Sequence, residues 1–147
     1  MIPTIKRKRK REWRSKKKKR KGKSKRDNSR SKHELYLEKL VRRFLRKMKT
    51  EVVGDDTESF ERWQIDITIP EHKIAIELNG PIHYKPIFGP KRFEKICERD
   101  RLKKKDVLGA GWKFLVVRYT EEYFDKRLVA KRFYRDIVPV LREITSN

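Results

Sequence analysis

Three segments carry apolar residues at helical spacing. In the first, which follows Ser31, the apolar positions are Leu35, Leu37, Leu40, Val41, Phe44, Leu45 and Met48. Ser31 followed three residues later by Glu34 is a capping-box pattern, so a helix is predicted to begin at Ser31. The second helix is predicted from Lys91 to Leu108, ahead of the stop signals at Gly109 and Gly111. The third covers residues 128–144, with a kink or restart near Pro139.

Strict alternation of apolar and polar residues marks two strands. In "WQIDITI" (63–69) and "KIAIEL" (73–78), isoleucine or leucine occupies every second position. The intervening "PEHK" predicts a hairpin turn. Residues 51–59 are predicted to be a loop, and residues 79–90, broken by Gly and Pro, a loop with at most one short strand. "WKFLVVRY" (112–119) predicts a buried strand.

The order of these elements, α-β-β-(β)-α-β-α, predicts an α/β fold in which a mixed sheet lies between helices. Almost all of its predicted helical and strand residues lie after residue 32, and residues 33–147 are expected to form one domain. Residues 1–32 form a separate basic arm with very few large apolar side chains. Such a segment cannot bury enough apolar surface to fold by itself and is expected to be flexible.

Charge is concentrated in this arm. It holds 18 Lys or Arg against two acidic residues, a net charge of +16 out of +22 for the chain. A run such as Lys16, Lys17, Lys18, Lys19 and Arg20 favours nucleic acid as the partner, because neutralising phosphates releases condensed counterions. A nuclear-import signal or a solubilising tail are the alternatives for this segment.

Several protein classes do not fit the sequence. The longest apolar run is "FLVV", far short of a membrane span, and no apolar segment follows the basic N-terminus as it does in a secretory signal. Cys97 is the single cysteine, which excludes an internal disulfide and fits a reducing compartment such as the cytoplasm. No membrane partner is expected.

Asp66 and Glu77 stand out within the two alternating strands. If Glu71 and His72 form the hairpin loop, Asp66 lies directly opposite Glu77, and a shift of one residue makes them diagonal neighbours on the same face. Opposed Cβ atoms lie about 5 Å apart, and like charges at that distance need compensation. A divalent cation such as Mg²⁺ or Mn²⁺ would provide it, while pairing with one of the many lysines is the alternative.

Further chemistry is expected from His83 and two acidic residues on helices. A Gly-Pro bend before His83 could return its imidazole toward the carboxylates, where a neutral imidazole could act as a general base. Asp100 falls on the apolar stripe of the second helix, so it needs a partner; this is either the same site or an i,i+4 pair with Lys104. Glu34 is by itself a capping-box residue, and His33 is expected to be exposed.

The arrangement of Glu34, Asp66, "AIELNGPIHY", Asp100 and "GWKFLVVRY" resembles the very-short-patch-repair-like branch of the PD-(D/E)XK nucleases. Within that branch it is most similar to phage-type homing endonucleases with a Glu-Asp-His-Asp site, over residues 31 to 125. The resemblance implies a restriction-endonuclease-like core in which Asp66 binds metal and His83 lies near the scissile phosphate. Asp100 and Glu34 would supply helical carboxylates. The superfamily's usual lysine, two residues after the second acid, is Asn79 here, which leaves Glu77 either a metal ligand or an orienting carboxylate.

These observations lead us to expect a Mg²⁺-dependent endonuclease that acts on DNA, most simply double-stranded DNA. The arm, together with Lys103 and Lys104 on the second helix, would contact the DNA backbone. A homodimer would suit double-strand cleavage, since one site cuts one strand. The alternative function is RNA binding without cleavage, because RNA-binding domains of organellar proteins resemble the same fold and share a similar "E-x-[ND]-G-P-x-H" stretch.

Overall fold

The computed structural model describes residues 30–146. The predictions for residues 1–29, including the basic run at 16–20, lie outside the described residues. Residues 31–146 belong to one compact unit. Its helices are α2 (Lys32–Phe44), α3 (Pro90–Gly109), α4 (Lys126–Arg132) and α5 (Val138–Thr145), and its strands are β1 (Val53–Asp56), β2 (Ile65–Ile69), β3 (Ile74–Asn79) and β4 (Lys113–Arg118).

Short helical turns connect several of these elements. Three are 3₁₀ turns: η1 (Arg46–Met48), η2 (Pro70–His72) and η3 (Pro81–His83). A π-helical segment, η4 (Phe133–Ile137), joins α4 to α5, and α5 begins beside Pro139. The predicted restart near Pro139 is confirmed. It occurs because a proline cannot continue the hydrogen-bond ladder of a preceding helix.

The four strands form one mixed sheet in the order β1-β2-β3-β4. β1, β2 and β3 are antiparallel neighbours, whereas β4 runs parallel to β3. A parallel pair requires a crossover connection, and α3 supplies it between β3 and β4. The predicted α/β class with a mixed sheet flanked by helices is confirmed.

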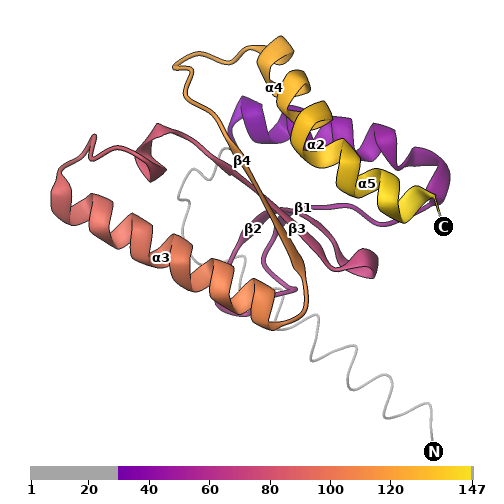
Figure 1. Ribbon diagram of the computed structural model, residues 1–147, viewed down its shortest axis with the longest axis horizontal. Coiled ribbons are helices and arrows are strands. Elements are labelled where there is room, and N and C mark those ends of the chain that lie inside the picture. Colours follow the sequence, from indigo (N-terminus) through magenta and orange to yellow (C-terminus); the bar gives the residue numbers. More distant parts are fainter. Residues whose placement is uncertain (1–29, 147) are drawn as a thin grey trace, which may run out of the picture. The chain divides into compact units, whose positions relative to one another are not determined.

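Helices cover both faces of the sheet (Figure 1). α2, α4 and α5 lie together on one face, where the main core forms around fully buried side chains such as Leu37, Ile67, Ile76 and Phe133. α3 lies on the opposite face, where a smaller cluster contains Trp63, Ile65, Ala75 and Val107. The indole N–H of Trp63 also donates to Asp106 of α3 at 2.6 Å, which ties that helix to the start of β2.

The β2–β3 hairpin has the first of the two predicted registers. Ile67 is opposite Ile76 and Ile69 is opposite Ile74, and the chain reverses through η2 with Lys73 in the left-handed region at φ 53°. The pairing ends at Ile67 and Ile76, one residue short of Asp66 and Glu77.

One predicted loop contains a strand. β1 lies within residues 51–59, where Gly54 and Asp55 gave no strand signal. It forms because it pairs with β2 and because the buried Asp56 carboxylate accepts the Thr68 hydroxyl at 2.5 Å. The optional strand expected within residues 79–90 is replaced by η3 among the described residues.

Three further expectations were wrong. β4 is an edge strand, and Val117 is its only fully buried residue. The apolar stripe of α3 is also largely open, since Val107 is its only buried member. His33 is 7% exposed, not an exposed first-turn residue, because its ring stacks on Tyr119 with centroids 4.2 Å apart. The predicted N-cap of α2 is confirmed, since the Ser31 hydroxyl accepts the Glu34 N–H at 3.1 Å.

Candidate functional site

β2 and β3 separate at the ends that hold the two candidate carboxylates. The last paired residues before this point are Ile67 and Ile76. Beyond them, the Asp66 carboxylate accepts the backbone N–H of Leu78 at 2.8 Å, and the backbone of Asp66 hydrogen-bonds to the Glu77 side chain. Side chains therefore replace the regular strand pairing here, and both acidic groups are fixed by backbone donors.

Glu77 is a buried carboxylate with an acidic and a basic neighbour. Burial, followed by the negative charge of Asp66, raises its pKa to about 7, while Lys103 acts in the opposite direction. The Lys103 Nζ lies 3.2 Å from Glu77 Oε1 and 3.1 Å from the carbonyl oxygen of Gln64. The predicted repulsion between Asp66 and Glu77 is thus present, and Lys103 partly compensates it.

His83 and Asp100 form a direct contact. His83 ends η3, Asp100 lies on α3, and the distance from His83 Nδ1 to Asp100 Oδ2 is 2.7 Å. In the neutral imidazole, an Nδ1–H that donates to the carboxylate leaves the lone pair on Nε2. Asp100 therefore has His83 as its partner, which is the functional alternative rather than an ion pair with Lys104.

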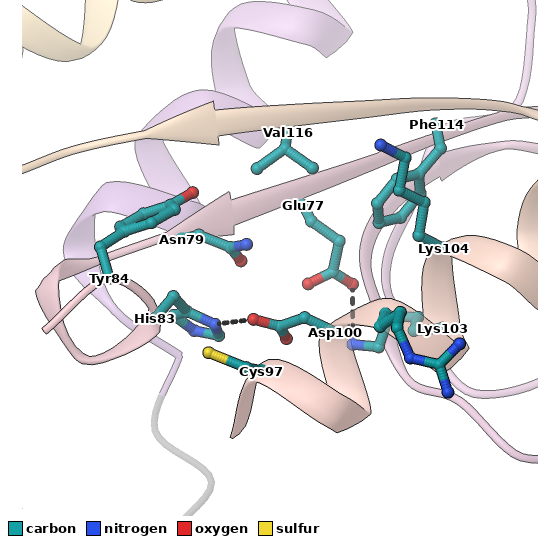
Figure 2. Close-up of a pocket in the computed structure, with 11 residues that line it drawn as sticks. Glu77, Asn79, His83, Tyr84, Cys97, Asp100, Lys103, Lys104, Phe114 and Val116 are labelled. Carbon is teal, nitrogen blue, oxygen red and sulfur yellow. Dashed lines mark hydrogen bonds and ion pairs between the residues drawn. The ribbon is translucent and has the colours of Figure 1, made fainter. Parts of the chain in front are cut away.

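These side chains line a pocket of about 340 Å³ between α3 and the sheet. Figure 2 shows the His83–Asp100 contact beside the Glu77–Lys103 ion pair. The pocket brings together five of the predicted residues: Glu77, His83, Asp100, Lys103 and Lys104. Its remaining walls are Asn79, Tyr84, Cys97, Arg101, Phe114 and Val116.

Asp66 and Glu34 do not line this pocket, but both lie close to Tyr119 at the end of β4. Burial raises the pKa of the Tyr119 hydroxyl, and the charges of Glu34, Glu121 and Asp66 raise it further. Asp66 therefore interacts electrostatically with both Glu77 and Tyr119 and connects the pocket to the start of α2.

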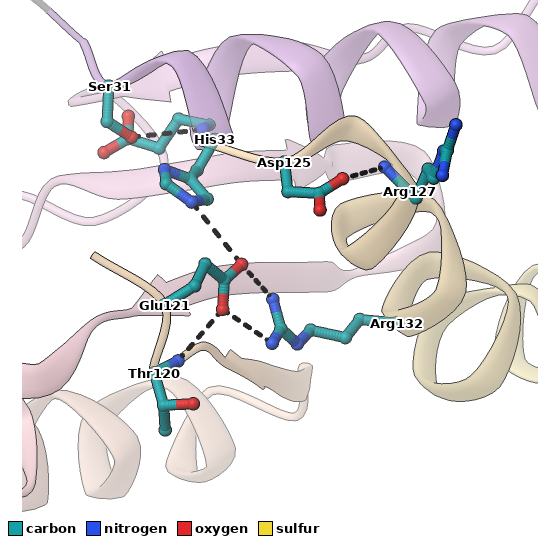
Figure 3. A network of polar contacts seen from close by, with 8 residues as sticks. Ser31, His33, Thr120, Glu121, Asp125, Arg127 and Arg132 are labelled. Carbon is teal, nitrogen blue, oxygen red and sulfur yellow. Dashed lines mark hydrogen bonds and ion pairs between the residues drawn. The ribbon is translucent and has the colours of Figure 1, made fainter. Parts of the chain in front are cut away.

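A second polar network lies on the α2 side of Tyr119 (Figure 3). Glu121 forms two hydrogen bonds with Arg132 of α4, at 2.5 and 2.7 Å, and these lower the pKa of Glu121 to about 2. His33 Nε2 lies 3.6 Å from Glu121 and has no hydrogen-bond partner among the described residues. This network joins α4 to the segment after β4, and Glu121 lies beside the His33 ring on which Tyr119 stacks.

Sequence reasoning missed several pocket residues. Tyr84 is held under the guanidinium of Arg118, whose Cζ lies 3.8 Å from the ring centroid. Asn79 follows Glu77 by two residues, so strand alternation could have placed it on the same face. Arg118 comes from a strand 34 positions after Tyr84, and no local pattern predicts such a contact.

The acidic pair fits a divalent cation only if other groups complete the coordination. Among residues 30–146, no group of three or more His, Cys, Asp or Glu side chains is arranged to hold a metal. Mg²⁺ is commonly bound by one or two carboxylates with waters and substrate phosphates, however. Asp66 and Glu77, whose charges repel each other, are two oxygen donors of this kind, but Glu77 is paired with Lys103 and Asp66 lies outside the pocket wall.

Comparisons with known proteins add no family assignment: no protein-family model matches the chain, and no curated protein matches it. Within the part of the chain that the structure describes, no helix has both the length and the apolar character needed to cross a membrane.

Proposed function

We propose that the protein is a Mg²⁺-dependent DNA endonuclease that hydrolyses phosphodiester bonds. The observation that carries this proposal is the pocket in which the His83–Asp100 pair faces a buried carboxylate and basic side chains. A histidine oriented by a carboxylate is suited to accept a proton from water, and the nearby cationic groups are suited to hold a phosphate.

In the proposed reaction, a water oxygen forms a new bond to phosphorus and the bond to the leaving ester oxygen breaks. His83 Nε2 takes the proton of the attacking water, while Asp100 stabilises the imidazolium through Nδ1–H. The leaving oxygen gains a proton from solvent. Mg²⁺, held by Asp66 and Glu77, would supply Lewis-acid stabilisation of the phosphate charge.

The fold is compatible with this proposal. A mixed sheet with helices on both faces is consistent with the restriction-endonuclease-like core that the resemblance to the very-short-patch-repair-like nucleases implies. Of the residues that carry the resemblance, His83 and Asp100 line the pocket, whereas Asp66 and Glu34 lie near Tyr119 outside its wall.

RNA binding without cleavage is the second candidate. It is favoured by the ion pair between Lys103 and Glu77, which satisfies the carboxylate without a metal. A binding module would need the cationic surface but not the His83–Asp100 pair.

The proposal is tested by incubating the full chain with supercoiled plasmid DNA in Mg²⁺, in Mn²⁺ and in EDTA. Wild type is expected to nick or linearise the DNA only with a divalent cation. Asp66→Asn keeps a side-chain oxygen that can accept the Leu78 N–H. This variant is expected to abolish cleavage while DNA binding persists. His83→Ala should slow cleavage roughly 10²–10⁴-fold.

Matched controls are available at the other end of the hairpin. His72→Ala and Glu71→Ala remove the same types of side chain at η2, away from the pocket, and should cleave at wild-type rates. If wild type binds DNA or RNA but cuts neither with any divalent cation, the binding module is the correct function.

A further inference from the structure

The acidic character of the pocket raises a question about phosphate binding. Glu77 and Asp100 line the pocket, and Asp66 lies close enough to raise the pKa of Glu77. A phosphodiester is an anion, so these carboxylates oppose its entry unless a positive charge is already in place.

Lys103 is the basic side chain most firmly fixed at this position. Its side chain is 16% exposed, and its Nζ donates both to Glu77 Oε1 and to the Gln64 carbonyl oxygen. An ammonium group has three N–H donors, so one remains for a ligand in the pocket that Lys103 lines.

The other basic groups of the pocket wall are held differently. Arg101 is 61% exposed and pairs with Glu98 on the solvent side of α3, and Lys104 is exposed. Among residues 30–146, neither side chain is bonded to a strand, whereas Lys103 contacts both β3 and the residue before β2.

Helical spacing also places Lys103 next to the catalytic pair. Asp100 and Lys103 are three residues apart on α3, so they lie one turn apart on the same face. Figure 2 shows the two contacts side by side: Asp100 with His83, and Lys103 with Glu77. A phosphate between them would meet the imidazole and the ammonium together.

We propose that Lys103 is the resident cation of this pocket and admits a nucleic-acid phosphodiester without a divalent cation. Lys103 neutralises Glu77 and offers its remaining N–H to a non-bridging phosphate oxygen. This inference rests on the proposed function for the identity of the ligand. It differs from that function in that it concerns binding alone, so it is tested without any cleavage.

The probe is a thymidine dinucleotide, which carries one phosphodiester, titrated into the full-length protein in EDTA. Binding is followed through the NMR signals of the His83 ring, which report the pocket and not the basic arm. The wild-type signals are expected to shift and saturate in EDTA. Lys103→Met should weaken this binding by about tenfold or more, the effect of one charge-assisted hydrogen bond.

Rescue by a cation separates a binding role from a structural one. Adding Ca²⁺ to Lys103→Met should restore binding to within a few-fold of wild type, because the ion replaces the missing charge beside Glu77. Lys103→Arg keeps the charge and should stay close to wild type without Ca²⁺. Lys105→Met removes the same charge from an exposed position of α3 outside the pocket wall and should bind as wild type.

Thermal unfolding shows whether Lys103→Met is folded. If it is not, Lys103→Gln, which keeps a donor for Glu77, takes its place with the same expectations. The inference is overturned if wild type shows no His83 shift in EDTA, if the uncharged variant binds equally well, or if Ca²⁺ does not restore its binding. None of these results bears on strand cleavage in Mg²⁺, which tests the proposed function separately.

Discussion

At the scale of single residues, the fold raises the pKa of Glu77 enough to make the stability of the protein depend on pH. Its pKa of about 7 lies above the ordinary value of 4.5, because the side chain is buried and faces Asp66. Between these two pH values the folded protein holds a proton that the unfolded chain has lost. The free energy of unfolding is therefore expected to fall as pH rises from about 4.5 to 7, and to lose this dependence above that range.

Urea unfolding in EDTA across that pH range measures this effect. Glu77→Gln should reduce the fall in the free energy of unfolding over this pH range by about 1–3 kcal/mol. Asp66→Asn should narrow the pH range over which the free energy of unfolding falls, because removing a negative charge lowers the pKa of Glu77. An unchanged slope in Glu77→Gln would show that another group produces the dependence.

The same residues show what can be read from the sequence alone. Alternation predicted that Asp66 and Glu77 share a face, because strand side chains have a strict period of two, but only Glu77 lines the pocket. Lys103 as the partner of Glu77 could not be predicted, because the contact spans 26 positions and depends on where α3 crosses the sheet. His33 was misread because its burial depends on Tyr119, at the end of a strand far along the chain.

At the scale of elements, the regular segments were predictable and the irregular ones were not. The helices α2 and α3 and the strands β2, β3 and β4 lie within a few residues of their predicted bounds, since each has its own periodicity. β1 has no such pattern and is specified by its partner strand and by the Asp56–Thr68 bond. The open faces of α3 and β4 could not be foreseen, because the sequence does not show that a pocket separates them.

The junction between β3 and η3 provides an element-scale prediction. A Cβ atom at Gly80 would lie 2.6 Å from the Tyr119 hydroxyl oxygen and 2.7 Å from Cζ, too close for either to remain in place. Tyr119 cannot move freely because it stacks on His33. Gly80→Ala is therefore expected to lower the free energy of unfolding by about 1–3 kcal/mol.

Thermal or urea unfolding of Gly80→Ala checks this expectation. Gly109→Ala is the matched control: apart from its chain neighbours and its own helix backbone, nothing lies within 4 Å of the added Cβ, and it ends α3, where alanine is the better helix former. The control should be neutral or slightly stabilising. Equal stabilities of the two variants would mean that Tyr119 does not pack against Gly80.

At the scale of the whole molecule, the positive charge is distributed unevenly along the chain. Of the net charge of +22, +16 belongs to residues 1–32, whereas the domain that contains the pocket carries only +6. Affinity for nucleic acid should therefore depend mainly on the N-terminal segment, and chemistry on the pocket. This separation suggests that the two properties can be removed independently.

Deletion of residues 1–29 tests that division while keeping Ser31, whose hydroxyl caps α2. The plot of log K against log [salt] should become less steep by several units, because each lost phosphate contact contributes about 0.9. Replacing the run at 16–20 by glutamine should give a smaller change in the same direction. At saturating protein, the cleavage rate with Mg²⁺ should remain that of the full chain, because every residue of the pocket lies beyond residue 76. A salt dependence identical to that of the full chain would show that the basic segment serves a partner other than DNA, and that the domain alone makes the phosphate contacts.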